Sequence, residues 1–144
     1  MKRTCFVSFF ILVLALPFLC AEESALDHYR RGLAYERLGK LQDAYTELQL
    51  ASALDSKSSG AALALGIVAG RLGRYDEAQR ALEQSIVLDA NSVASYYHLA
   101  MICEKKNLRD RASEYWNRFL ALNQDAPLGQ IARKHLQRLE SGAR

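Results

Sequence analysis

A 34-residue repeat constrains the fold of this chain more than any other feature of its sequence. The segment LGRYDEAQRALEQSIVLDA, residues 72–90, has a counterpart 34 residues upstream, LGKLQDAYTELQLASALDS, and a more divergent one 34 residues downstream, KNLRDRASEYWNRFLALNQ. The three registers 25–58, 59–92 and 93–126 align without a gap. Such periods are typical of stacked supersecondary units, of which about three are needed for a stable stack.

Each unit predicts two amphipathic helices joined by a short turn. Gly39, Gly73 and Asn107 follow the first helix of their units, and these residue types tolerate the left-handed conformation that ends a helix. The eighth and twentieth places of every unit hold small residues: Gly32, Gly66, Ala100, Ala44, Ala78 and Ala112. We therefore expect the two helices of each unit to pack closely against one another.

This pattern resembles the tetratricopeptide repeat family in unit length and in the placing of its small and large apolar residues. The resemblance covers residues 25–126 and implies an all-α fold, an α-solenoid in which three helix hairpins form a right-handed superhelix. After Pro127 the segment LGQIARKHLQRL predicts one more helix, so we assign residues 127–144 to a capping helix and tail. We expect its apolar face to comprise Leu128, Ile131, His135, Leu136 and Leu139.

Two features mark the N-terminal end of the repeat. Residues 22–24 form a short lead-in, and Ser24 followed by Asp27 predicts a cap on the first helix. Arg31 stands at the seventh place of the first unit, where the other two units have leucine. We expect no preceding unit to bury an apolar side chain there.

The resemblance implies a binding groove on the concave face, which the first helix of each unit lines. Helical spacing of i, i+3, i+4 and i+7 supports the same grouping. The predicted partner-binding groove comprises Tyr29, Leu33, Arg37, Leu63, Ile67, Arg71, Tyr97, His98, Met101 and Lys105. Its six apolar members form a stripe that can hold an extended segment or an amphipathic helix. The alternative is a tighter superhelix whose own packing fills the stripe.

Some relatives clamp the terminal carboxylate of a chaperone peptide with lysine, asparagine and arginine. The matching places here hold Tyr29, Leu33, Ala94 and His98, so we do not predict chaperone-tail binding.

The sequence offers no pattern for catalysis, a metal or a cofactor. Cys103 stands at a core place, the three histidines show no metal-ligand spacing, and GIVAGRLG matches neither nucleotide-binding glycine motif. We therefore expect a non-catalytic scaffold that binds a protein or peptide partner and needs no cofactor. A small-ligand binder or enzyme accessory subunit is the alternative from another class.

Residues 1–21 predict a secretory signal peptide. Lys2 and Arg3 precede an apolar run, and cleavage is expected after Ala21. The remaining chain has 17 basic and 16 acidic residues, a balance that does not favour nucleic acid as a partner. We expect an exported protein, periplasmic or secreted. Retention of the segment or lipidation of Cys20 would instead anchor it in the cell envelope, as in assembly factors of outer-membrane or pilus machines.

Overall fold

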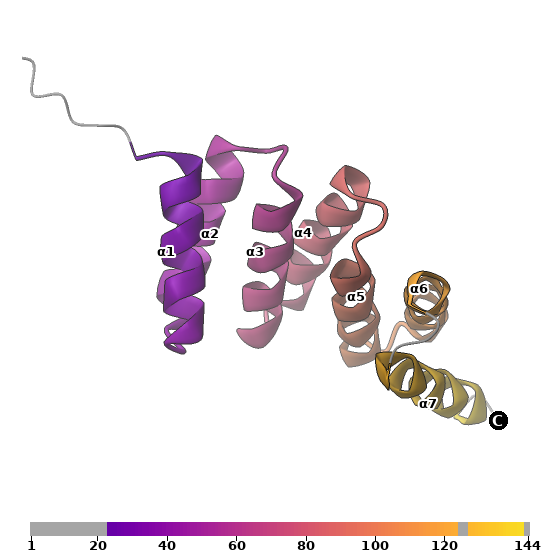
Figure 1. Ribbon diagram of the computed structural model, residues 1–144. Coiled ribbons are helices and arrows are strands. Elements are labelled where there is room, and N and C mark those ends of the chain that lie inside the picture. The colour runs from indigo at the N-terminus through magenta and orange to yellow at the C-terminus, as the bar shows by residue number, and fades with distance from the viewer. Residues whose placement is uncertain (1–22, 124–126, 143–144) are drawn as a thin grey trace, which may run out of the picture.

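The computed structural model describes residues 23–123 and 127–142, which form seven α-helices and no strand. The helices are α1 (Ala25–Arg37), α2 (Leu41–Leu54), α3 (Ser59–Arg71), α4 (Tyr75–Leu88), α5 (Val93–Lys105), α6 (Arg109–Leu122) and α7 (Pro127–Ser141). The first six pair as three successive hairpins, which stack side by side as a solenoid (Figure 1). The all-α solenoid that the repeat predicts is confirmed.

Several expectations fall outside the residues that the structure describes. They are the signal peptide at 1–21, the lipidation of Cys20, the first lead-in residue Glu22, and the end of the third unit at 124–126. Among the described helices, none is both long enough and apolar enough to cross a bilayer.

The hairpin turns and the first helix cap have the predicted geometry. Gly39, Gly73 and Asn107 have φ angles of 73°, 77° and 58°, in the left-handed region. The Ser24 side chain accepts a hydrogen bond from the backbone N–H of Asp27, while the Asp27 carboxylate accepts one from the backbone N–H of Ser24. This reciprocal cap satisfies backbone groups that the first turn of α1 would otherwise leave without a partner.

Small residues let the two helices of a hairpin approach until the side chain of one touches the backbone of the other. A Cβ atom added to Gly32 would lie 2.6 Å from Cγ of Leu48, and one added to Gly66 would lie 2.5 Å from Cγ of Leu82. Both distances are too short for carbon atoms in van der Waals contact. The two leucines therefore occupy the space that a larger residue at the eighth place would need.

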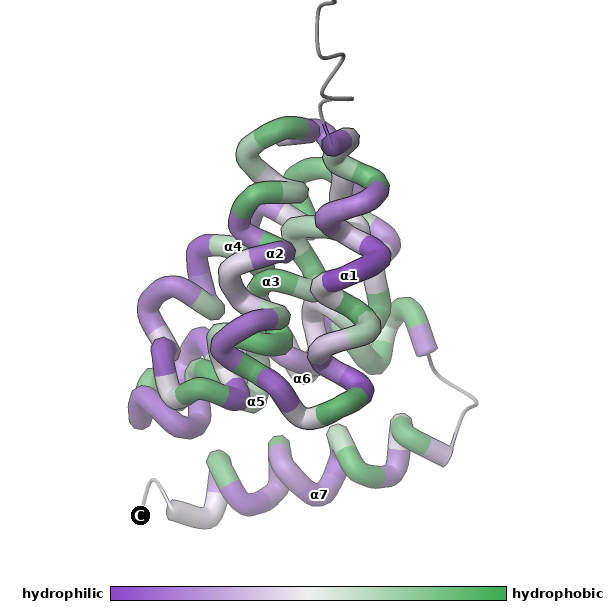
Figure 2. The backbone as a smooth tube through the Cα atoms, turned by 90° about the vertical axis from the view of Figure 1, so that its left-hand side faces the viewer, coloured by the Kyte–Doolittle hydropathy of each residue, from purple (hydrophilic) through white to green (hydrophobic). Residues whose placement is uncertain are grey.

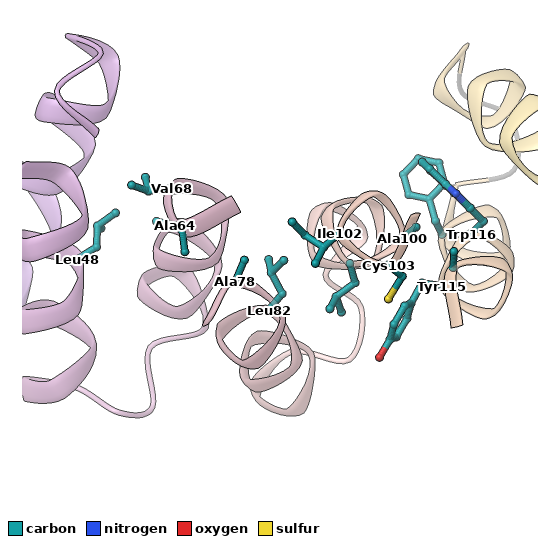
Figure 3. Close-up of a cluster of buried hydrophobic side chains, with 14 of the residues drawn as sticks. Leu48, Ala64, Val68, Ala78, Leu82, Ala100, Ile102, Cys103, Tyr115 and Trp116 are labelled. Carbon is teal, nitrogen blue, oxygen red and sulfur yellow. The ribbon is translucent and has the colours of Figure 1, made fainter. Parts of the chain in front are cut away.

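The buried core runs as a band from one hairpin to the next (Figure 3). Leu48 and Leu82 belong to its first two hairpins, and Trp116 and Phe119 fill the third; all four have at most 1% of their surface exposed. The core also contains two serines whose hydroxyl groups are satisfied, because Ser95 Oγ donates to Ser85 Oγ at 2.9 Å. Burial of these hydroxyl groups therefore leaves no polar atom without a partner.

Charged side chains, and not apolar ones, cover one side of the first hairpin. Arg31 donates through Nε to Glu47 at 3.0 Å and through Nη1 to Glu23 at 2.6 Å. His28, which is buried, lies with Nδ1 2.8 Å from the same Glu47 carboxylate. The arginine at the seventh place therefore belongs to a cluster of charged side chains at this end of the described stack.

Helix α7 packs against α6 and extends along one end of the stack (Figure 2). Its apolar face was predicted wrongly in part. Gly129 and Ala132 are buried, whereas Leu128 and Ile131 are 48% and 40% exposed. The small residues allow close approach to α6, so the helix turns these in and the two large side chains out. Three of the predicted residues do pack inward: His135, Leu136 and Leu139.

Candidate functional site

The first helices of the three hairpins, α1, α3 and α5, form one layer of the solenoid, which we call the leading-helix face (Figure 1). A pocket of about 320 Å³ opens between α3 and α5, and we call it the α3–α5 pocket. Six of the predicted groove residues line it: Ile67, Arg71, Tyr97, His98, Met101 and Lys105. Helical spacing on two neighbouring helices is what brings these six side chains together.

A missing side chain explains why the pocket lies between these two helices. The twelfth place of the repeat holds Glu36 in the first unit and Glu104 in the third, but Gly70 in the second. Gly70 lines the pocket, and a Cβ atom added there would lie 3.0 Å from Cδ1 of Ile102. Gly70 stands at one of the groove places that the family resemblance implies, but it is not among the ten predicted groove residues. The repeat could have indicated Gly70, because a glycine replaces the glutamate that the other two units have at this place.

The other four predicted residues do not line this pocket. Tyr29 borders a separate hollow of about 90 Å³ between α1 and the start of α3. Leu33 and Leu63 are partly buried and pack against the core, and Arg37 is exposed at the end of α1. The structure therefore gathers six of the ten predicted residues at one place and distributes the rest along the same face.

The apolar stripe is less exposed than the sequence predicts. Five of its six members pack against the buried core while keeping part of their surface exposed: Tyr29, Leu33, Leu63, Tyr97 and Met101. The ring centroid of Tyr97 lies 5.5 Å from that of Trp116 in an edge-to-face arrangement and 5.8 Å from that of Phe119. Aromatic pairs of this kind stabilise a core. Tyr97 thus stabilises the core and also lines the α3–α5 pocket.

Cationic side chains lie on the rim of the α3–α5 pocket, and no acidic side chain lines it. Lys105 is exposed and forms no ion pair within the described part of the chain. Arg71 donates from Nη1 to the carboxylate of Glu36, which joins α3 to α1. Burial lowers the pKa of His98, so its imidazole is neutral at pH 7 and adds no charge.

Glu104 stands at the twelfth place of the third unit, as Glu36 does in the first. Its carboxylate interacts with side chains of α6 and α7. Its Oε1 accepts from Nε1 of Trp116 at 2.7 Å and lies 2.7 Å from Nδ1 of His135, while Oε2 accepts from Nη2 of Arg138 at 2.6 Å. Burial of the carboxyl opposes its ionisation, but these hydrogen bonds and the attraction of His135 hold its pKa below the usual range. Helix α7 therefore engages Glu104, the acidic residue that precedes Lys105 on α5.

The lining of the α3–α5 pocket combines apolar surface with a few polar and cationic side chains. The pocket has neither a carboxylate nor a thiol in its lining. Cys103 is fully buried, and burial raises the pKa of its thiol. Within the described residues, no group of three or more histidine, cysteine, aspartate or glutamate side chains could hold a metal ion.

Two wider hollows, of about 560 and 620 Å³, lie over the second helices of the hairpins. Their lining is more polar; the larger one includes Arg74 and Glu77, which form an ion pair with each other, and Tyr45, which donates to Glu77. Ligand sites are mostly apolar with a few placed polar groups. The α3–α5 pocket fits this description better than either hollow, although it is smaller.

Comparison with known families gives a match to the second and third hairpins. Residues 60–92 and residues 93–125 each match the model of the tetratricopeptide repeat (TPR). The second and third hairpins are therefore similar to TPR repeats. The match covers α3 to α6, the helices that form the α3–α5 pocket and the layer behind it. A comparison with curated proteins found no match.

Several solved structures share the fold of the chain. The type III secretion chaperone SycD of Yersinia enterocolitica, solved with a peptide of the translocator YopD, is 21% identical, with a TM-score of 0.77 over 83% of this chain and 94% of that one. PcrH, solved with the chaperone-binding region of PopD, is 23% identical, with a TM-score of 0.77 over 83% and 92% of the two chains.

The first TPR domain of Spaghetti (RPAP3), bound to the HSP90 peptide SRMEEVD, is 16% identical, with a TM-score of 0.77 over 83% of this chain and 93% of that one. At these identities the likeness is one of fold. All three neighbours were solved with peptides bound.

Proposed function

We propose that the protein is a non-catalytic interaction module that binds a segment of a partner protein on its leading-helix face, with the α3–α5 pocket as the central contact. The observation that carries this proposal is the convergence of six side chains from two TPR helices on one mainly apolar pocket of about 320 Å³. The three structural neighbours described above bind peptides, which supports a peptide segment as the ligand.

The physical case rests on a preformed apolar contact with a polar rim. Ile67 and Met101 supply partly exposed apolar surface, and Arg71 and Lys105 supply charge at the edge. Interfaces draw most of their binding free energy from a few buried apolar or aromatic anchors, and the charged rim adds specificity. An occupant side chain in the pocket would be such an anchor.

The test uses a matched pair of substitutions, Ile67→Ser and Val87→Ser. Ile67 lines the pocket, whereas Val87 is 83% exposed on α4. Both remove a β-branched apolar side chain from a helix, so their effects on helix formation are similar. Partners captured from a native extract by the wild-type protein are identified, and their affinities for both variants are measured by calorimetry.

We expect Ile67→Ser to weaken binding about tenfold, or about 1.4 kcal/mol, and Val87→Ser to leave it unchanged. Equal affinities of the two variants would contradict the proposal. A double variant, Tyr97→Ala with Leu63→Ala, would test the same face less specifically. Both side chains also pack against the core, so their loss would affect folding as well as binding.

We also propose that the protein acts in the cell envelope. The proposal rests on the charged and apolar pattern of residues 1–21. Mass spectrometry of the protein isolated from its native envelope tests it. A free N-terminus at Glu22 is the expected result, whereas an acylated Cys20 would show a membrane-anchored protein and an intact N-terminal segment would refute cleavage.

A further inference from the structure

The leading-helix face carries a row of cations at one place of the repeat. The thirteenth place holds Arg37, Arg71 and Lys105, the last residues of α1, α3 and α5. All three side chains are exposed. Because α1, α3 and α5 lie side by side, these cations follow one edge of the face (Figure 1). A cation in the last turn also favours the helix itself, so its presence in one helix needs no partner.

Within the described residues, an acidic side chain pairs with only one of the three cations, Arg71. At the twelfth place, Glu36 is paired with Arg71, and the middle unit has Gly70 in place of an acid. The third unit has Glu104, which is held by three side chains of α6 and α7.

Two cations of the row consequently have no ion-pair partner within the described residues, Arg37 and Lys105. Lys105 also lines the α3–α5 pocket, together with Arg71. The pocket thus joins an apolar interior to a cationic edge at the same end of the helices. A cationic edge is complementary to carboxylates, and it selects against segments that carry lysine or arginine there.

We propose that the occupant of the leading-helix face is an acidic amphipathic segment: one apolar side chain enters the α3–α5 pocket, and aspartate or glutamate residues beside it pair with Lys105, Arg71 and Arg37. The proposal rests on the function proposed above and specifies the chemistry of its partner. Packed helices lie about 8–10 Å apart and each residue of an extended segment spans roughly 3.3 Å, so we expect the carboxylates within about four residues of the anchor.

The test is selection of random 12-residue peptides displayed on phage against the full chain. The expected result is enrichment of Leu, Ile, Met or Phe with Asp or Glu within four residues of it. The selected peptides are then synthesised, and their affinities are measured by fluorescence anisotropy for the wild type, Lys105→Glu and Lys57→Glu. Lys57 is an exposed lysine of the α2–α3 connection, so its reversal changes the net charge equally.

We expect Lys105→Glu to weaken binding about tenfold and Lys57→Glu to change it by less than about twofold. Binding to the wild type should also weaken as salt is added, because exposed charge pairs are screened. Exchange of the one peptide carboxylate that pairs with position 105 for lysine should restore binding to Lys105→Glu. This rescue shows direct pairing and also shows that the variant is folded.

The outcomes separate this proposal from the function that it rests on. Peptides that lose affinity with Ile67→Ser but show no acidic enrichment and no response to Lys105→Glu would overturn the acidic partner and leave the docking face in place. Peptides that respond to neither substitution would overturn both proposals.

Discussion

The same substitution at two glycines of one helix is expected to have different effects on stability. Gly66 and Gly70 are one helical turn apart on α3, and each is changed to alanine. Alanine favours a helix over glycine by about 1 kcal/mol, so the gain in helix propensity is the same for both. The two positions differ in what the new methyl group meets, which makes each a control for the other.

At Gly66 the methyl carbon would lie 2.5 Å from Cγ of Leu82 and 3.2 Å from the backbone oxygen of Ala78. The backbone atom cannot rotate away, so relief requires α3 and α4 to move apart. Overpacking of this kind costs about 1–3 kcal/mol, and the backbone contact favours the upper end. After the propensity gain we expect Gly66→Ala to lower the free energy of unfolding by about 2 kcal/mol.

At Gly70 the nearest atom is Cδ1 of Ile102 at 3.0 Å, the end of a flexible side chain that can shift by a few tenths of an ångström. We expect the stability of Gly70→Ala to equal that of the wild type or to exceed it by up to about 1 kcal/mol. The same methyl group narrows the α3–α5 pocket, so partner binding should weaken although stability does not.

Urea denaturation followed by circular dichroism at 222 nm measures both stabilities. A shift of the Gly66→Ala midpoint to lower urea, with little or no shift for Gly70→Ala, is the expected result. Equal midpoints would refute the close packing of α3 on α4 at Gly66. Tighter partner binding by Gly70→Ala would refute the role given to the pocket.

Two further predictions concern Glu104 and Cys103. Glu104→Gln should destabilise the protein at pH 7 by about 1–3 kcal/mol, since hydrogen bonds to a charged group are weakened, and Trp116 fluorescence should report the change at its indole N–H. The folded state lowers the pKa of Glu104, so its contribution is present above the unfolded pKa near 4.5 and is lost as the pH falls through the folded pKa. The difference in stability between wild type and Glu104→Gln should therefore shrink in acid, and a difference that grows there would contradict the assignment. Cys103 should react with a thiol reagent in the native protein at least about 100-fold more slowly than in urea, because its thiol is buried and its pKa is raised; equal rates would show that it is accessible.

The hairpins could be predicted from the sequence because their packing is local and recurs with the repeat. Gly32 and Gly66 repeat at one place, as do Leu48 and Leu82, and each leucine packs on the glycine of its own hairpin. The repeat therefore predicts how the two helices of a hairpin contact each other, as well as where the helices lie.

The packing of α7 could not be predicted in the same way, because this helix has no second copy in the chain to compare it with. An apolar residue on a helix is buried only if the neighbouring helix accepts it, and here Gly129 and Ala132 give the closer approach. Leu128 and Ile131 consequently remain exposed.

The site was predicted as a face, but its pocket depends on contacts between units. Ile67, Met101 and Lys105 share the pocket as expected from their places in the repeat. The space itself comes from Gly70, and the free charge of Lys105 comes from the capture of Glu104 by α7. Neither effect follows from helix periodicity, since each involves side chains from different units.

Photo-cross-linking tests most directly whether the partner lies on the leading-helix face. Benzoylphenylalanine is placed at position 67, on α3 in the pocket, and separately at position 87, on the exposed side of α4. The account predicts that irradiation in cells that make the protein attaches the same partner segment to position 67 and leaves position 87 without it. Attachment at position 87 with none at position 67 would place the partner on the opposite layer and contradict the account.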